Sequence, residues 1–108
     1  MSNAIFRMMS QHLARTEILA GDYTAQELLA GFIMMLSRRY GRIGRPRNEI
    51  LLPMSRRDLA NYLRLAPETV SRLFTRFSRE GLIQVESRAI TLMDPEQLSR
   101  LAAPLKEL

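Results

Sequence analysis

Apolar residues recur along the chain with the period of an α-helix. The clearest run places five of them at spacings of three or four residues: Leu29, Phe32, Ile33, Leu36 and Tyr40. Such spacing puts all five on one face of a helix. Just upstream, Thr24 and Glu27 have the spacing of a capping box, in which each side chain satisfies a backbone donor at the helix start. The pattern predicts a helix over residues 25–40 with this face in the core.

A less regular apolar pattern lies at the start of the chain. Its members still have helix-like spacing: Ile5, Met8, Met9, Leu13 and Leu19. His12 and Thr16 interrupt the stripe, and Gly21 follows it and can supply a left-handed stop. We predict a helix over residues 4–19, whose interrupted stripe suits the tail of an element that packs on another part of a longer protein.

Two short helices are predicted in the middle of the chain, after a basic loop and a strand. Gly41 and Gly44 end the first pattern, and "RIGRPR" leads into "NEILLP", which we predict to be a short strand. Ser55 then caps a helix that turns three apolar residues inward: Leu59, Ala60 and Leu63. Residues 64–66 form a turn, and Pro67 begins a fourth helix over residues 67–80. Two helices joined by three residues predict a helix-turn-helix.

The end of the chain predicts a β-hairpin and one more helix. "LIQV" and "AITL" flank the polar turn "ESR", with Ile83 and Val85 on one face of the hairpin. Asp94 and Pro95 then cap a short helix that runs to about Ala102. The fold class is therefore mainly α with a small β component.

The helix over residues 67–80 has two chemically different sides. Its buried stripe consists of Val70, Leu73, Phe74 and Phe77, and the opposite side carries Glu68, Ser71, Arg72, Thr75 and Arg79. One acid, two hydroxyls and two arginines suit a DNA groove, because arginine bridges guanine O6 and N7 and glutamate accepts from cytosine N4. The alternative is an ordinary solvated face with an Arg72–Glu68 ion pair that contributes only about 0.3 kcal/mol.

Charge is distributed unevenly along the sequence. The formal net charge is +5, but the stretch from Arg38 to Arg79 alone holds eleven arginines and only three acids. Guanidinium groups match phosphate oxygens and stay charged, so this stretch suits phosphate binding, although it also suits a well-solvated surface. The predicted phosphate contacts flank or follow the outward face of the fourth helix: Arg56, Arg57, Thr75, Arg76 and Arg79.

Composition excludes several kinds of site. The chain has no cysteine, so disulfides, zinc–thiolate sites and iron–sulfur ligation within it are excluded, and cytoplasm is the expected compartment. The longest apolar run, residues 28–36, is far shorter than the ~20 residues of a membrane span. His12 is the only histidine, and it has no partner motif, Gly-rich phosphate loop or metal-ligand spacing around it. We expect no catalytic activity.

A family resemblance covers nearly the whole chain from Thr24 to Leu101. "SRRDLANYLRLAPETVSRLFTRFSREGLI" resembles the helix-turn-helix of the CRP/FNR family of bacterial transcription regulators, and "ETVSR" resembles the recognition helix of its FNR branch. "LLAGFIMMLSRRYGRIG" resembles the helix that precedes this motif, and "IQVESRAITL" resembles the wing. The resemblance implies a winged helix-turn-helix DNA-binding domain over residues 23–108, preceded in residues 1–22 by the end of a dimerisation helix.

The resemblance also assigns roles. Glu68, Ser71 and Arg72 take the base-reading positions of the family's E-x-x-S-R motif, which implies double-stranded DNA as the partner and a half-site of the TTGAT type. The family binds palindromes as homodimers and contacts RNA polymerase through surface loops. "GRIGRPR" is our candidate for such a loop, the alternative being a solvated basic turn. The family's sensor barrel lies outside this sequence, so we expect no cofactor in this part of the protein and its effector is unknown.

Three positions depart from the family pattern. Pro67 stands where the cyclic-AMP receptor branch has a base-reading arginine, which favours the TTGAT half-site over TGTGA. Arg64 occupies a turn position where relatives usually have glycine, at a cost of about 1 kcal/mol if its backbone is left-handed. Ala66 stands where serine or threonine often caps the recognition helix, which forgoes ~1 kcal/mol.

The sequence also fits one alternative function, protein binding. Winged helices also bind proteins, and Met8 and Met9 offer flexible apolar side chains to a partner helix. The chain is then a protein-interaction module without sequence-specific DNA binding.

Overall fold

The first described helix, α2 (Ala25–Arg42), forms the centre of the molecule. The structure is a computed structural model that describes residues 23–105; the helix predicted over residues 4–19 and the segment 1–22 lie outside this range. The capping box is confirmed, because Thr24 N donates to Glu27 Oε1 at 2.9 Å and Glu27 N donates to Thr24 Oγ1 at 3.2 Å. The helix ends two residues beyond the predicted limit.

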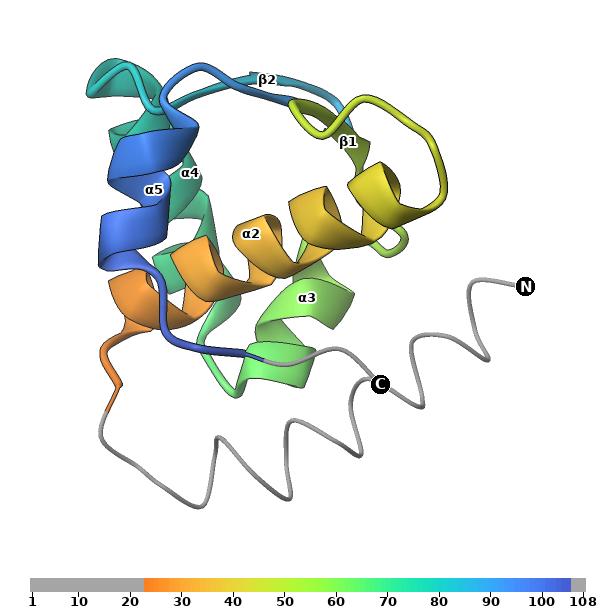
Figure 1. Ribbon diagram of the computed structural model, residues 1–108. Helices are drawn as coiled ribbons and strands as arrows, with labels where there is room; N and C mark the ends of the chain where they lie inside the picture. The colour runs from red at the N-terminus through yellow and green to blue at the C-terminus, as the bar shows by residue number, and fades with distance from the viewer. Residues whose placement is uncertain (1–22, 106–108) are drawn as a thin grey trace.

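In its central part, α2 is buried on all sides and not on one face only. All ten residues from Leu28 to Ser37 are buried, because α4, α5 and β1 (Glu49–Leu51) pack around the helix. Figure 1 shows α2 running across the middle of the molecule, with α5 against its N-terminal half. The prediction of a single buried face was therefore too narrow.

The predicted helix-turn-helix is formed by α3 (Arg56–Leu63) and α4 (Pro67–Arg79), which pack against each other. Ser55 Oγ accepts from Asp58 N at 3.1 Å, which confirms the cap of α3. The predicted inward residues of both helices are buried: Leu59, Ala60, Leu63, Val70, Leu73, Phe74 and Phe77. Tyr62 is buried as well, with its ring edge-on to Phe32 at 5.5 Å between centroids, and this burial raises the pKa of its hydroxyl.

The turn between the two helices has the two local costs that the sequence suggested. Arg64 adopts left-handed backbone angles, φ 59° and ψ 43°, a region in which a side chain is unfavourable and glycine is not. Ala66 stands at the N-cap of α4, and no side chain accepts a hydrogen bond there. Neither cost prevents the motif from forming, because the apolar faces of both helices are buried in the core.

Replacing Arg64 with glycine is expected to raise the free energy of unfolding by about 0.5–1 kcal/mol, because glycine adopts the left-handed conformation without strain. Urea denaturation followed by circular dichroism measures the change. The matched control is Arg64→Ala, which removes the same charge but keeps Cβ and the strain. An equal gain from Arg64→Ala would show that charge, and not backbone strain, is responsible.

A three-stranded antiparallel sheet forms the wing, in the order β1-β3-β2. Strands β2 (Ile83–Glu86) and β3 (Ala89–Leu92) confirm the predicted hairpin, but its turn has two residues, Ser87 and Arg88, where three were expected. Ser87 has a φ of 58°, which suits the tight two-residue connection because such turns favour positive φ. Ile83 is buried and Val85 partly buried, as their shared face predicted.

The last helix, α5 (Pro95–Leu101), leads into a short segment that crosses α2. Its cap is confirmed by Asp94 Oδ1, which accepts from Gln97 N at 3.1 Å. Beyond the helix, Ala103 N donates to Glu27 O at 2.9 Å, and Arg38 Nη2 donates to Leu105 O at 2.8 Å. We call residues 102–105 the C-terminal strap, since both its ends are tied to α2.

Candidate nucleic-acid interface

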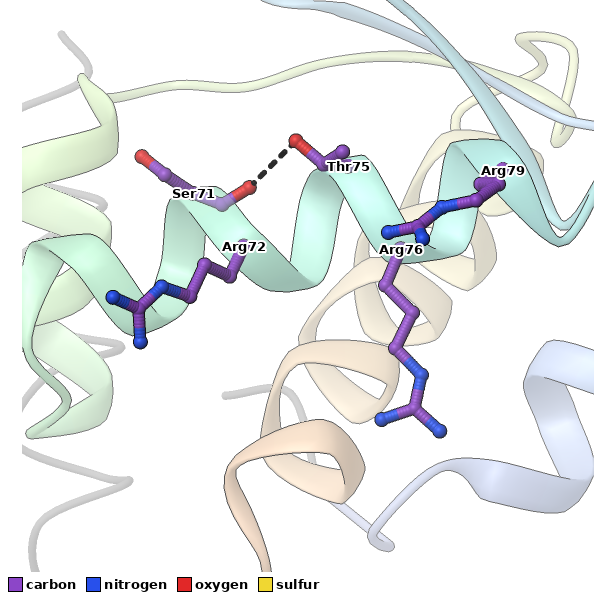
Figure 2. A pocket seen from close by; sticks show the side chains of 5 residues that line it. All are labelled: Ser71, Arg72, Thr75, Arg76 and Arg79. Carbon is purple, nitrogen blue, oxygen red and sulfur yellow. Dashed lines mark hydrogen bonds between the residues drawn. The ribbon is translucent and has the colours of Figure 1, made fainter.

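The outward side of α4 is an exposed polar surface. Every predicted member of that side is exposed: Glu68, Ser71, Arg72, Thr75 and Arg79. Figure 2 shows Ser71, Arg72, Thr75, Arg76 and Arg79 following one another along the helix. They line a shallow groove of about 400 Å³, so a row of guanidinium and hydroxyl groups faces solvent along this helix.

Some polar side chains of this surface are bonded within the protein and others are not. Thr75 Oγ1 donates to Ser71 O at 3.1 Å within the helix, and Arg76 Nε contacts Glu80 Oε2 at 3.1 Å. Glu68 and Arg72 form no ion pair with each other, and Arg72 extends toward the N-terminal end of α4 (Figure 2). The ion pair that would have explained this face as an ordinary solvated one is therefore not formed.

The two arginines at the start of α3 have different surroundings. Arg57 is exposed to solvent, whereas Arg56 is only partly exposed. The guanidinium carbon of Arg56 lies 4.3 Å from the ring centroid of Phe74, and its Nη2 donates to Ser87 O at 2.7 Å. The structure thus places Arg57 at the surface and Arg56 between α4 and the hairpin turn.

A second crevice of about 360 Å³ runs between α4 and the wing. Its lining combines one guanidinium, three hydroxyls and two apolar side chains: Arg56, Ser71, Phe74, Thr75, Ser78 and Val85. Ser78 was not among the predicted site residues, although its position seven residues after Ser71 puts it on the same helix face. Arg88 was predicted only as a turn residue, and the structure exposes its side chain at the hairpin turn.

The basic loop after α2 is tied to the helix at several points. Ser37 Oγ donates to Arg47 O at 2.8 Å, and Arg45 N donates to Tyr40 O at 2.9 Å. Arg42, Arg45 and Arg47 are exposed, as is the apolar Ile43, which is 63% exposed. The loop is therefore a basic surface whose backbone is hydrogen-bonded to α2, and it exposes one apolar side chain.

Comparison with known proteins identifies the domain type. The protein-family model of the Crp-like helix-turn-helix domain matches residues 27–101 of this chain. Within the described residues, no helix is long and apolar enough to cross a membrane.

Individual relatives agree with this match. The chain is 44% identical over 98 residues to the "Transcriptional regulatory protein btr" of Bordetella pertussis, covering 88% of this chain and 40% of that protein. It is 40% identical over 101 residues to the "Transcriptional activator protein FnrA" of Stutzerimonas stutzeri, covering 91% and 41%. The chain thus spans about two fifths of the length of these relatives, which are transcription regulators by name.

A solved structure shows the same fold. FixK2 from Bradyrhizobium japonicum superimposes with a TM-score of 0.71 at 34% sequence identity, covering 86% of this chain and 46% of that one. The arrangement of α3, α4 and the three-stranded wing is that of a winged helix-turn-helix. With 75 consecutive residues matched to the Crp-like helix-turn-helix model, the chain belongs to the CRP/FNR family of bacterial transcription regulators, as a DNA-binding domain of the FNR type.

Proposed function

We propose that α4 enters the major groove of a TTGAT-like half-site and reads its bases through Glu68, Ser71 and Arg72. The observation that carries this proposal is the pair Glu68 and Arg72, which are exposed, one helical turn apart and not bonded to each other. A helix-turn-helix presents the N-terminal part of its second helix to base edges. These two groups lie in the first two turns of α4.

Each reading group has a role that its chemistry favours. Arg72 donates two hydrogen bonds to O6 and N7 of the guanine in the half-site, while Glu68 accepts from a cytosine amino group. The hydroxyl of Ser71 contacts an adjacent base. Since the Arg72 guanidinium is not held by an acid of α4, it meets the base without first breaking an ion pair.

Phosphate contacts are proposed for the basic and hydroxyl groups around the reading surface. They comprise the exposed members of the predicted set, Arg57, Thr75, Arg76 and Arg79. Arg79 and Arg57 are exposed, whereas Arg76 must exchange its contact with Glu80 for a phosphate. That exchange is inexpensive, because exposed ion pairs contribute only about 0–1 kcal/mol.

The partners of the whole protein follow the same proposal. Two copies bind a palindrome, because each α4 reads one half-site and half-sites about one helical turn apart need two linked reading helices. The held basic loop of residues 41–47 is the proposed contact for RNA polymerase. Within this domain the proposed binding requires no cofactor.

A titration with labelled duplex DNA tests the function. Fluorescence anisotropy is measured on a TTGAT palindrome and on a scrambled duplex of equal composition, each at two salt concentrations. Sequence-specific binding predicts tighter binding to the palindrome at both salt concentrations, with specific binding exceeding non-specific binding by roughly 10³-fold or more for the intact dimer. Equal, weak binding to both duplexes would instead favour the protein-interaction module.

Replacing Arg79 with alanine is expected to weaken binding to all duplexes alike and to lower the slope of log K against log salt by about 1. A phosphate contact is sequence-independent and releases counterions, which explains both effects. The matched control is Arg100→Ala, since Arg100 is an exposed arginine of α5 paired with Glu96 and lies outside the proposed surface. A change of base preference in Arg79→Ala would show that its assigned role is wrong.

A further inference from the structure

We infer that Arg56 is a positioning residue, which holds the turn of the wing against the recognition helix and so sets where Arg88 meets DNA. The inference rests on the proposed DNA binding and adds to it a residue that acts through another one. It gives Arg56 a different role from the direct phosphate contact suggested by the sequence.

Arg56 bridges three elements at once. It is the first residue of α3, its guanidinium stacks over Phe74 of α4 at 4.3 Å, and its Nη2 donates to the carbonyl of Ser87 at 2.7 Å. Phe74 is only 3% exposed, so the ring under the guanidinium is fixed in the core. The hairpin turn is therefore tied to a rigid part of α4 through one side chain.

The other carbonyl of the hairpin turn is held as well. Arg88 O accepts from Leu52 N at 2.9 Å, just beyond the end of β1. With Ser87 O held by Arg56 and Arg88 O held by Leu52, both turn residues have fixed backbones. The exposed side chain of Arg88 then projects from a defined point beside α4.

Part of the Arg56 guanidinium is committed within the protein. Nη2 is engaged by Ser87, and Nε is buried with no hydrogen-bond partner in the structure. An unpaired buried donor is unfavourable, so this arrangement is retained at a cost, which the stack and the charge-assisted hydrogen bond offset. Arg57 is better placed as a direct phosphate ligand, because it is exposed whereas Arg56 is only partly exposed.

The geometry needs arginine in particular. A planar guanidinium stacks face-on over an aromatic ring and donates sideways at the same time, whereas a lysine ammonium is a point donor on a flexible stem. Lysine at this position keeps the charge but does not hold ring and carbonyl together. Arg56→Lys therefore separates positioning from simple charge.

A double-mutant cycle tests the inference on the full chain with a TTGAT duplex. We expect Arg88→Ala to weaken binding about three- to ten-fold by loss of a phosphate contact. Arg56→Ala is expected to weaken DNA binding by a similar factor. The double variant should bind no more weakly than either single variant, because the two residues act as one unit. Three outcomes would each overturn the inference. The first is a double variant whose loss of affinity equals the product of the two single losses. The others are a loss in Arg56→Ala when Arg88→Ala shows none, and no loss in Arg56→Ala at all.

Two further measurements keep the test independent of DNA binding and of folding. Hydrogen exchange of the Leu52 amide, bonded to the turn, is expected to accelerate in Arg56→Ala and Arg56→Lys and to stay unchanged in Arg57→Ala. Arg56→Met, which keeps the apolar stem, replaces Arg56→Ala if the latter does not fold. Wild-type affinity in Arg56→Lys, or an unchanged Leu52 amide, would overturn the positioning role. Failure of the wild-type chain to bind any duplex would instead contradict the proposed function.

Discussion

Arg72→Ala is expected to weaken binding to a TTGAT duplex by about 1–3 kcal/mol, which is roughly 5- to 150-fold in Kd. The loss would come from the proposed bidentate contact to guanine, made by an exposed guanidinium that no acid of α4 neutralises. Anisotropy titration on this duplex, and on one in which the G·C pair is inverted, measures both affinity and preference. The preference for the cognate duplex should fall with the affinity.

Glu68→Ala is the informative companion of this variant. An exposed carboxylate repels phosphate and rejects wrong bases, so its removal should relax specificity with a smaller loss, or even a gain, in non-specific affinity. A large loss of cognate affinity therefore marks Arg72→Ala, whereas relaxed specificity with little loss of affinity marks Glu68→Ala. If both kept the wild-type ratio between the cognate and inverted duplexes, Glu68 and Arg72 would not be base-reading residues.

Gly31→Ala is expected to lower the free energy of unfolding by about 1–3 kcal/mol. A Cβ at this position would lie 2.6 Å from Ala103 O, which is backbone and part of the C-terminal strap. The strap is tied on both sides of this point, through Glu27 O and the Arg38 guanidinium, so it has little room to shift. Alanine's better helix propensity, about 1 kcal/mol, offsets only part of the clash.

Gly41→Ala is the matched control within the same helix. Its Cβ would lie 2.7 Å from Cγ of Arg47, but the Arg47 side chain is exposed and can turn away. That rotation offsets the gain in helix propensity but involves no backbone clash, so Gly41→Ala should destabilise much less than Gly31→Ala. Urea denaturation compares the two variants, and equal effects would show that the strap yields to Gly31→Ala.

Local signals in the sequence were sufficient for most elements of the fold. The cap residues Thr24, Ser55 and Asp94 each bond the backbone donor three residues on, so they mark helix starts without reference to the rest of the chain. The buried stripe of α4 follows directly from its spacing. Burial around the whole of α2 did not follow, because it depends on α4, α5 and β1 arriving from distant parts of the chain.

The candidate site shows the same division. Exposure of Glu68, Ser71 and Arg72 was predictable, since a helix with one apolar stripe turns its other side outward. The surroundings of Arg56 were not, because its contacts with Phe74 and Ser87 join residues 18 and 31 positions away. Sequence spacing reports neighbours on one helix, whereas long-range contacts decide which arginine is free to bind.

Tyr40 has a consequence for the exposed edge of the sheet. Asn48 O accepts from Leu92 N, and Leu52 N donates to Arg88 O, so the backbone groups of Asn48 and Leu52 point toward β3 and the hairpin turn. Backbone groups alternate in direction along an antiparallel strand. The N–H and C=O of Leu51 therefore face away from the sheet. The Tyr40 hydroxyl accepts from Leu51 N at 3.1 Å and donates to Leu51 O at 3.3 Å. An edge strand with free backbone groups and an apolar side chain that is 56% exposed is a template for intermolecular pairing. The Tyr40 hydroxyl occupies both outward backbone groups of Leu51, so this position of the β1 edge is closed to a strand from another molecule.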